Sequence, residues 1–364
     1  MQREINIRFQ TCHLTVLITP YSYDISVPEK ERRLVFYLAM EEYVAAHLHT
    51  ILADRADKEA FFMWQVSPTV IFGRNQVMEA EVNIPYCKEH GVNLFRRKSG
   101  GGCVYSDKGN IMLSYITDTT DVAAAFEKYL DELSGYLSAT GVNAYKSGRN
   151  DVMIDGKKVS GNAFFLKPQS SIVHGTMLFD TDFDALERAI TPSGAKIQSK
   201  GVSSVRQHVT NLKPLYEKLD SPLRNIDLFK LYLKKCFCSE GETIDEIVLS
   251  DAQIADIEKI EAGYLNPDFL MGRNHRYSAR HSGRISGVGE ICLELDVEAE
   301  TVTGCHLSGD FFPIKDGLEE LVSEKLNGKE YDIAKIREAL GNIDPSPYVA
   351  GLGTEAFLFI LKQQ

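Results

Sequence analysis

The chain has 364 residues, of which 44% are hydrophobic and 25% charged, the composition of a soluble globular protein with enough apolar material for real cores. Its length favours two or three domains. The formal charge of −11 argues against nonspecific nucleic-acid binding as the main task. No stretch approaches the roughly 18 apolar residues of a membrane span. The first seven residues lack the apolar core of a signal peptide, so we expect a cytoplasmic protein without a membrane anchor.

The cysteines are odd in number, scattered and without a C-x-x-C pair, which suits reduced thiols and offers no zinc site. The seven are Cys12, Cys87, Cys103, Cys236, Cys238, Cys292 and Cys305. The segment Cys236-Phe-Cys238 is interpreted as an ordinary apolar stretch and not as a metal clip.

In the first part of the chain, hydrophobic periodicity predicts strands and helices in mixed order. We expect strands at 13–19, 92–97 and 111–116, two strand pieces within 62–72, a polar turn at 73–76, and helices at 34–48 and 122–137. A glycine-rich loop separates the strands at 92–97 and 111–116.

The clearest hairpin follows. Its strands are predicted at 152–154 and 157–165, joined by Asp155-Gly156, because Asp-Gly readily takes the positive φ angles of a two-residue type I′ turn. A strand at 172–179 comes next, and Asp182 is a plausible N-cap for a helix at 183–190.

Around residues 240–250 the pattern changes, which predicts a domain boundary near residue 248. Ser250 and Gln253 have the spacing of a capping box that opens a helix to about residue 265. A basic patch rich in serine and glycine follows at 273–284, then strands at 290–297 and 301–307. The chain closes with helices, one of them ended by Asn327-Gly328. We therefore expect a mixed α/β part at 1–248 and a small α+β part at 249–364.

Three consecutive glycines, Gly100, Gly101 and Gly102, follow Arg96 and Arg97. Each glycine weakens a regular element by roughly 0.5–1 kcal/mol relative to alanine. Such a run suits a loop whose backbone N–H groups cradle an anion, with arginine as a bidentate donor. It equally suits a tight turn between strands.

A second polar cluster lies at 147–161. Lys157 and Lys158 leave the Asp-Gly turn in a strand, so they point to opposite faces, and one of them can act as a fixed cation over a site. The alternative is that both lysines lie exposed to solvent on the surface of the hairpin. Asp151 could hold Mg²⁺ or a ribose hydroxyl, since hard oxygen ligands suit that ion, or it could cap a turn.

His174 lies in a predicted strand, where a hydrogen-bonded histidine of the core or pocket wall competes with a general base. The sequence contains no evident serine–histidine–acid set, Walker A lysine or G-x-G-x-x-G fingerprint after a strand. Ordinary hydrolase, kinase and dehydrogenase functions therefore lose their main support.

At these residues the sequence resembles the lipoate–protein ligase A family. The run 96–110 is similar to that family's Arg-Arg-x-Ser-Gly-Gly-Gly-x-Val-x-His-Asp-x-Gly-Asn. Residues 148–151 with 155–163 are similar to its second motif, and His174-Gly-Thr-Met-Leu178 to its third. The segment 289–312 and the closing helices look like the family's small accessory domain. Together the similarity covers roughly residue 17 to the end.

The resemblance implies an α+β fold of the biotin/lipoate ligase type, with mixed sheets, flanking helices and a small α+β C-terminal domain. It implies that ATP and Mg²⁺ activate lipoate to lipoyl-AMP. It also implies transfer of the lipoyl group to a lysine of apo lipoyl domains in 2-oxoacid dehydrogenase complexes and of the glycine-cleavage H protein.

The resemblance also assigns residues. Lys158 matches the lysine that contacts both the lipoyl carbonyl and the adenylate phosphate. The implied ATP or adenylate contacts are Arg97, Gly102, Cys103, Val104, Tyr105, Asn150, Asp151 and Lys158. The implied lipoyl contacts are Lys158, Gly100, Gly101 and His174, and Asp151 is the implied Mg²⁺ ligand.

One residue departs from the family pattern: Ser106 stands where a histidine is common. A transferase that uses preformed lipoyl-AMP shares every motif, so the sequence leaves that alternative open. Octanoyl transfer needs a cysteine nucleophile shortly before the glycine–lysine motif, and residues 141–147 contain none. A degenerate, purely binding member is disfavoured by the intact Lys158, Asp151 and triple glycine.

Overall fold

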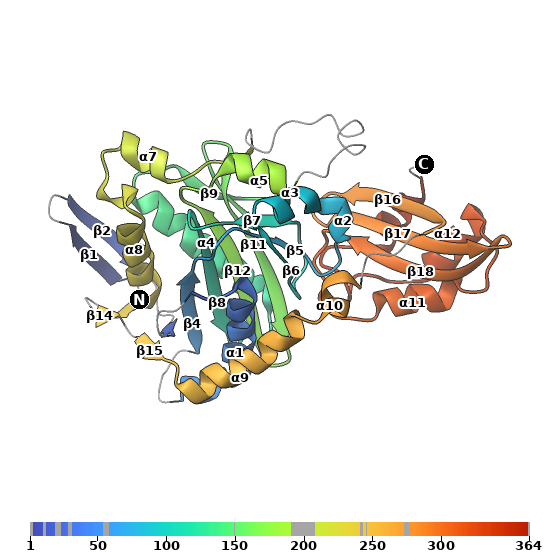
Figure 1. Cartoon of the computed structure of the whole chain (residues 1–364), viewed down its shortest axis with the longest axis horizontal. Helices are drawn as coiled ribbons and strands as arrows, with labels where there is room; N and C mark the ends of the chain where they lie inside the picture. Colours follow the sequence, from blue (N-terminus) through green and yellow to red (C-terminus); the bar gives the residue numbers. More distant parts are fainter. Residues whose placement is uncertain are drawn as a thin grey trace. The chain divides into compact units, whose positions relative to one another are not determined.

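The computed structural model describes residues 3–9, 12–18, 23–27, 31–53, 58–148, 150–190, 208–240, 243–244, 246–272 and 277–362 (Figure 1). The chain divides into two compact units that each gather several segments. Unit 1 contains residues 1–70, 83–95 and 105–265, and unit 2 contains residues 71–82, 96–104 and 266–364. The boundary expected near residue 248 stays a prediction.

An eight-stranded mixed sheet organises unit 1, in the order β15-β3-β4-β8-β12-β11-β10-β9. Its strands are β3 Tyr23–Ser26, β4 Glu59–Trp64, β8 Asn110–Thr117, β9 Ala144–Ser147, β10 Asp151–Ile154, β11 Lys157–Lys167, β12 Ser170–Leu178 and β15 Glu246–Val248. The pairs β15–β3 and β3–β4 are parallel, whereas the pairs from β4 to β9 are antiparallel.

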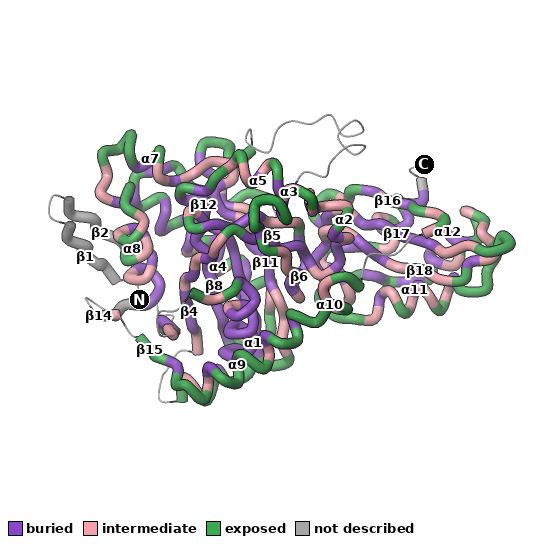
Figure 2. Tube along the Cα trace, in the orientation of Figure 1, coloured by how far each residue is buried: buried purple, intermediate pink, exposed green. Residues whose placement is uncertain are grey.

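Alternation along the central strands places helices on both faces of this sheet. Ser114 of β8 points toward α1 (Leu34–Ile51), where it donates a hydrogen bond to Glu41. The next residue, Tyr115, points the other way and stacks on Tyr129 of α4 (Val122–Ala139). Phe61 of β4 faces the same side as Tyr115 and stacks on Phe237 of α8 (Ile226–Cys238). Buried residues accordingly gather along α1 and the central strands (Figure 2).

The remaining elements of unit 1 are short, apart from α9. They are β1 Arg3–Phe9, β2 Cys12–Ile18, α3 Ile84–Glu89, α5 Phe183–Ile190, α7 Lys213–Lys218, η1 Pro222–Arg224, β13 Ser239–Glu240, β14 Thr243–Ile244 and α9 Asp251–Tyr264. A three-stranded sheet in the order β6-β5-β7 consists of β5 Thr69–Phe72, β6 Asn93–Arg96 and β7 Val104–Ser106. Its strands contain residues at which the sequence passes from one unit to the other.

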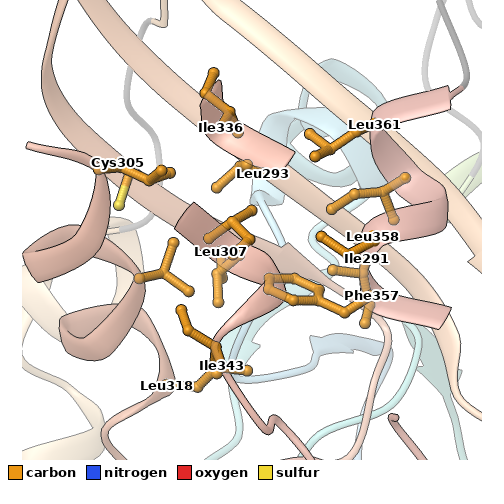
Figure 3. Close-up of a cluster of buried hydrophobic side chains, with 14 of the residues drawn as sticks. Ile291, Leu293, Cys305, Leu307, Leu318, Ile336, Ile343, Phe357, Leu358 and Leu361 are labelled. Atoms are coloured by element: carbon orange, nitrogen blue, oxygen red, sulfur yellow. The ribbon is translucent and has the colours of Figure 1, made fainter. Parts of the chain in front are cut away.

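Unit 2 is built on an antiparallel sheet in the order β16-β17-β18, covered by helices (Figure 1). Its elements are α2 Met78–Glu81, α10 Pro267–Met271, β16 Ala279–Ile285, β17 Gly289–Glu298, β18 Thr301–Gly309, α11 Leu318–Leu326, α12 Ile333–Gly341, α13 Thr354–Phe359 and η2 Ile360–Lys362. Figure 3 shows its apolar core, in which Leu293 and Leu307 of the sheet meet Ile336 and Phe357 of the helices.

The predicted fold class is confirmed, and so are several local signals. The Asp155-Gly156 turn has φ angles of 49° and 79°, Ser250 forms the capping box with Gln253, and Gly328 ends its helix with φ 78°. In the described part of the chain, no helix combines the length and the apolar character needed to cross a membrane.

Other elements were not predicted. The sequence analysis assigned no element to the basic patch at 273–284, but β16 occupies its second half, while residues 273–276 lie outside the described residues. β16 alternates, with His281 and Gly283 buried and the polar residues outward, so its serine and glycine content hid a strand. No element was predicted between residues 19 and 34, where β3 lies, or between the glycine run and β8, where β7 lies.

Candidate functional site

The hairpin of β10 and β11 presents the first part of the site, and its register is irregular. Asp151 pairs with Gly161 and Val152 with Ser160, but Met153 pairs with Lys158, so a bulge lies between them. Because of the bulge, Lys158 folds over its own strand. A Cβ atom at Gly161 would collide with the Lys158 ammonium. Gly161 is therefore the residue that leaves room for the Lys158 side chain.

Lys158 is a partly exposed ammonium held by a carboxylate. Its Nζ lies 2.7 Å from Asp151 Oδ1, and its side chain is 35% exposed. The neighbouring Lys157 is exposed, so the two lysines differ as the alternation predicts. The Lys158 carbonyl accepts a hydrogen bond from Thr210 N at 2.9 Å, which fixes the strand from the other side. The geometry suits a preorganised cation better than surface decoration.

Asn150 locks the start of the same hairpin. Its Nδ2 donates to the Asn162 carbonyl at 2.8 Å, and Asn162 Nδ2 donates to the Asn150 carbonyl at 3.0 Å. This reciprocal pair fixes the backbone directly before Asp151. The hairpin thus brings Asn150, Asp151 and Lys158 together, with the Asn150 amide donating to the backbone.

His174 belongs to a buried polar chain that crosses the sheet face under α1. Its Nδ1 lies 2.7 Å from Glu41 Oε2, and Ser114 Oγ donates to Glu41 Oε1 at 2.6 Å. Trp64 Nε1 in turn donates to Ser114 Oγ at 2.9 Å. All four side chains come from different elements, α1, β4, β8 and β12. His174 is therefore a buried, hydrogen-bonded histidine.

The sequence analysis did not single out Glu41 or Ser114. A signal was present, because Glu41-Glu42 lies within an apolar helix face, and two consecutive carboxylates that become buried require partners. Glu42 has them as well: it accepts from Tyr264 Oη at 2.7 Å and pairs with Lys167 Nζ at 2.9 Å.

The glycine run lies in unit 2 and is organised by Arg97. Its guanidinium is buried and donates to the carbonyls of Gly100 and Gly102, each at 2.7 Å, and to Ser99 Oγ at 3.0 Å. Burial lowers the pKa of the Arg97 guanidinium to about 10, so the group stays charged at neutral pH. In this conformation Arg97 shapes the loop through its carbonyls.

Arg96 performs a similar task one residue earlier. Its Nη1 donates to three carbonyls of the polar turn at 73–76, and its Nε and Nη2 reach the Leu270 carbonyl at 3.2 and 3.0 Å. Its guanidinium also lies over the Phe72 ring. Both arginines that the sequence offered as anion donors therefore stabilise the loop backbone.

The residues of the run differ in what surrounds them. Gly100 and Gly101 are buried against residues 311–313, whereas Gly102 is exposed, and no heavy atom of the described chain lies within 4 Å of the place that a Cβ atom would take there. Cys103 and Val104 are half-buried and Tyr105 is buried, and burial raises the Tyr105 pKa. Gly102 is the part of the run that is open to an incoming molecule.

Ser106, the departure from the family pattern, is fully buried on β7. Its Oγ has no hydrogen-bond partner among the described residues. A buried hydroxyl without a partner is destabilising, so Ser106 is not explained by the fold.

No group of three or more histidine, cysteine, aspartate or glutamate side chains in the described ranges could hold a metal ion. Asp151 offers a single carboxylate, already paired with Lys158. The protein alone therefore does not form a Mg²⁺ site here, although Mg²⁺ commonly binds through one carboxylate together with substrate phosphates.

Comparison with known proteins matches both parts of the chain. Residues 34–237 match the family model of the lipoyl protein ligase A/B catalytic domain, and residues 274–361 match that of the bacterial lipoate protein ligase C-terminus. The lipoate-protein ligase LplJ of Bacillus subtilis is 33% identical over 327 residues, covering 89% of this chain and 95% of that protein.

Solved structures share the fold. P. falciparum LipL1 in complex with lipoate superposes with a TM-score of 0.68 at 19% identity, covering 94% of this chain and all of that one. A lipoate-protein ligase A bound with ATP gives a TM-score of 0.56 at 22% identity, covering 69% of this chain and 99% of that one.

Proposed function

Because this chain belongs to the lipoate–protein ligase family, we propose that it activates lipoate with ATP and transfers the lipoyl group to a lysine of an acceptor protein. The observation that carries the proposal is the Lys158 ammonium, held 2.7 Å from Asp151 on a bulged hairpin. Bound ATP and bound lipoate in related structures support the choice of substrates.

In the first step, a carboxylate oxygen of lipoate attacks the α-phosphorus of ATP. The bond to the pyrophosphate oxygen breaks, pyrophosphate leaves, and lipoyl-AMP forms. In the second step, the acceptor's lysine amine attacks the acyl carbonyl, AMP leaves with the anhydride oxygen, and the amine loses a proton as the amide forms. Lys158 stabilises negative charge on the phosphate and carbonyl oxygens in both steps, an electrostatic role that needs no proton transfer.

We assign the nucleotide to residues that offer backbone donors or a charge. The proposed ATP and adenylate contacts are Arg97, Gly102, Cys103, Val104, Tyr105, Asn150, Asp151 and Lys158. The open backbone at Gly102 supports this assignment most directly. Arg97 and Asn150 serve it by fixing the loop and the hairpin, since their donors are bonded to backbone carbonyls.

We assign the lipoyl chain to Lys158, Gly100, Gly101 and His174, and extend the assignment to Glu41, which orients the His174 ring. Asp151 is the proposed protein contact for the Mg²⁺ that accompanies ATP, and the ion would neutralise phosphate charge. The proposed acceptors are the apo lipoyl domains of 2-oxoacid dehydrogenase complexes and the glycine-cleavage H protein.

The deciding experiment measures pyrophosphate release with ATP, Mg²⁺ and lipoate, followed by the mass of an apo lipoyl domain added to the same mixture. We expect lipoate-dependent pyrophosphate release and an acceptor whose lysine carries the lipoyl group. If pyrophosphate release is absent while synthetic lipoyl-AMP supports transfer, the chain is a transferase and the ligase proposal is wrong.

The role of Lys158 is tested with Lys158→Ala against Lys157→Ala, a matched removal of the exposed neighbour. Loss of a preorganised donor to a developing charge costs about 2.7–4 kcal/mol, or about 10²–10³ in rate. Only Lys158→Ala should show this loss, with an unchanged melting temperature. An equal effect of both substitutions would refute the assignment.

A further inference from the structure

The glycine run packs against the segment that follows β18 in unit 2, residues 311–313. Gly101 N donates to the Phe311 carbonyl at 3.3 Å. A Cβ atom at Gly100 would lie 2.7 Å from Pro313 Cδ and 2.9 Å from Phe312 Cα, closer than real Cβ atoms approach. At Gly101 it would lie 2.8 Å from Phe312 Cε1. Two of the three glycines are thus required by contact with the protein's own chain.

The run is also held by Arg97. The guanidinium donates to the carbonyls of Gly100 and Gly102, and a Cβ atom at Gly101 would also lie 3.1 Å from Arg97 Nη2. Gly101 therefore lies close to both the buried Arg97 guanidinium and the Phe312 ring.

Hydrogen bonds fix the backbone around Phe312. Phe312 is 1% exposed, and its carbonyl accepts from Ala350 N at 3.0 Å. Ile314 N donates to the Tyr348 carbonyl at 2.7 Å, and Gly309 N to the Asn75 carbonyl at 3.0 Å. The backbone is therefore held before, at and after Phe312, and the buried ring projects from a fixed stretch of chain.

We propose that Phe312 is a positioning residue for the nucleotide-binding backbone: it fixes Gly101 against Arg97 and thereby aims the open Gly102 at the substrate. This inference rests on the proposed function, which assigns Gly102 to the nucleotide. It gives the segment that follows β18 a direct part in shaping the run, through one aromatic ring.

The test compares Phe312→Ala and Phe312→Leu with Phe357→Ala. Phe357 is 0% exposed in the core of the same unit and is absent from the contacts of the glycine run. Misplacing a reacting group by about 1 Å can cost about 10²-fold. We therefore expect the KM for ATP in pyrophosphate release to rise by about tenfold or more in both Phe312 variants. Phe357→Ala should lower the melting temperature and leave KM unchanged, because fewer folded molecules lower kcat alone.

A second measurement does not depend on activity. Hydrogen exchange of the peptide containing Gly100–Gly102 should quicken in the Phe312 variants and not in Phe357→Ala, since the Gly101 amide bonds to the Phe311 carbonyl. Phe312→Leu keeps most of the buried volume and serves if the alanine variant does not fold. Unchanged exchange in the run, or an unchanged KM for ATP in an active variant, would overturn the inference. An inactive wild type with altered exchange in the variants would refute only the proposed function.

Discussion

Glu41→Ala should be among the most destabilising single substitutions in unit 1. Glu41 is 2% exposed and accepts two short contacts, from Ser114 Oγ at 2.6 Å and His174 Nδ1 at 2.7 Å. Removing the carboxylate deprives both groups of this acceptor inside the protein, where water cannot replace it. Trp64 is affected indirectly, because its indole donates to the same Ser114 hydroxyl.

The magnitude follows from the two groups that lose their acceptor, Ser114 and His174. Each buried polar group left unsatisfied costs about 1–3 kcal/mol, so we expect a loss of about 2–6 kcal/mol in the free energy of unfolding for Glu41→Ala. Glu41→Gln keeps an amide oxygen for Ser114 and the side-chain volume, and should cost less than half as much.

Urea unfolding followed by intrinsic fluorescence is the suitable assay, since the chain contains one tryptophan, Trp64, and it belongs to this network. Glu127→Ala is the control, because that side chain is 71% exposed and its pair with Lys146 should contribute less than about 1 kcal/mol. A loss below about 1 kcal/mol for Glu41→Ala would refute the claim that the network is a buried, satisfied unit.

Burial raises the pKa of the Glu132 carboxyl to about 7, with Glu59 and Asp131 adding to the shift and Lys128 opposing it, so ionisation in the folded state is costly. The free energy of unfolding should therefore fall as pH rises from about 4.5 to 7. In urea titrations, Glu132→Gln should raise the free energy of unfolding by up to about 3 kcal/mol at pH 8 and should leave it unchanged at pH 4.5. An increase of the same size at both pH values would contradict this. Gly100→Ala should lower the free energy of unfolding by about 1–3 kcal/mol, because the added methyl group overpacks a filled site. Gly102→Ala should leave the melting temperature unchanged or raise it slightly, because the site is open. Ser106→Ala should raise the free energy of unfolding by about 1 kcal/mol in the same assay, because it removes a buried hydroxyl without a partner; a loss would show that the hydroxyl is satisfied.

Local chemistry made much of the fold predictable. The Asp155-Gly156 turn, the Ser250 capping box and the helix end at Gly328 each depend on residues within four positions of one another. Strands that exist through pairing with distant partners were harder to predict. β16 is mostly polar and contains a glycine, and its register with β17, from Ala279 opposite Leu295 to Ile285 opposite Gly289, explains why it is extended.

The same distinction holds for the candidate site. Lys158 and Asp151 lie seven positions apart on one hairpin, so their proximity could be predicted from the sequence alone. Glu41 and His174 are separated by 133 residues and Ser114 and Glu41 by 73. No spacing rule links them, and their association follows from the order of β4, β8 and β12 beneath α1. The resemblance to the family supplied His174 but not the carboxylate that orients it.

The triple glycine shows how a structure divides a motif that looks uniform. A turn and an anion cradle were equal explanations for the run as a whole. Gly100 and Gly101 are glycines because Phe312 and its neighbours approach too closely for any side chain, so neither is evidence for a ligand. Gly102 is exposed, and nothing in the described chain lies within 4 Å of where its Cβ would be. The Cβ positions of Gly135, Gly263 and Gly353 are equally open, so the open space at Gly102 leaves room for the proposed nucleotide contact but does not by itself indicate a ligand.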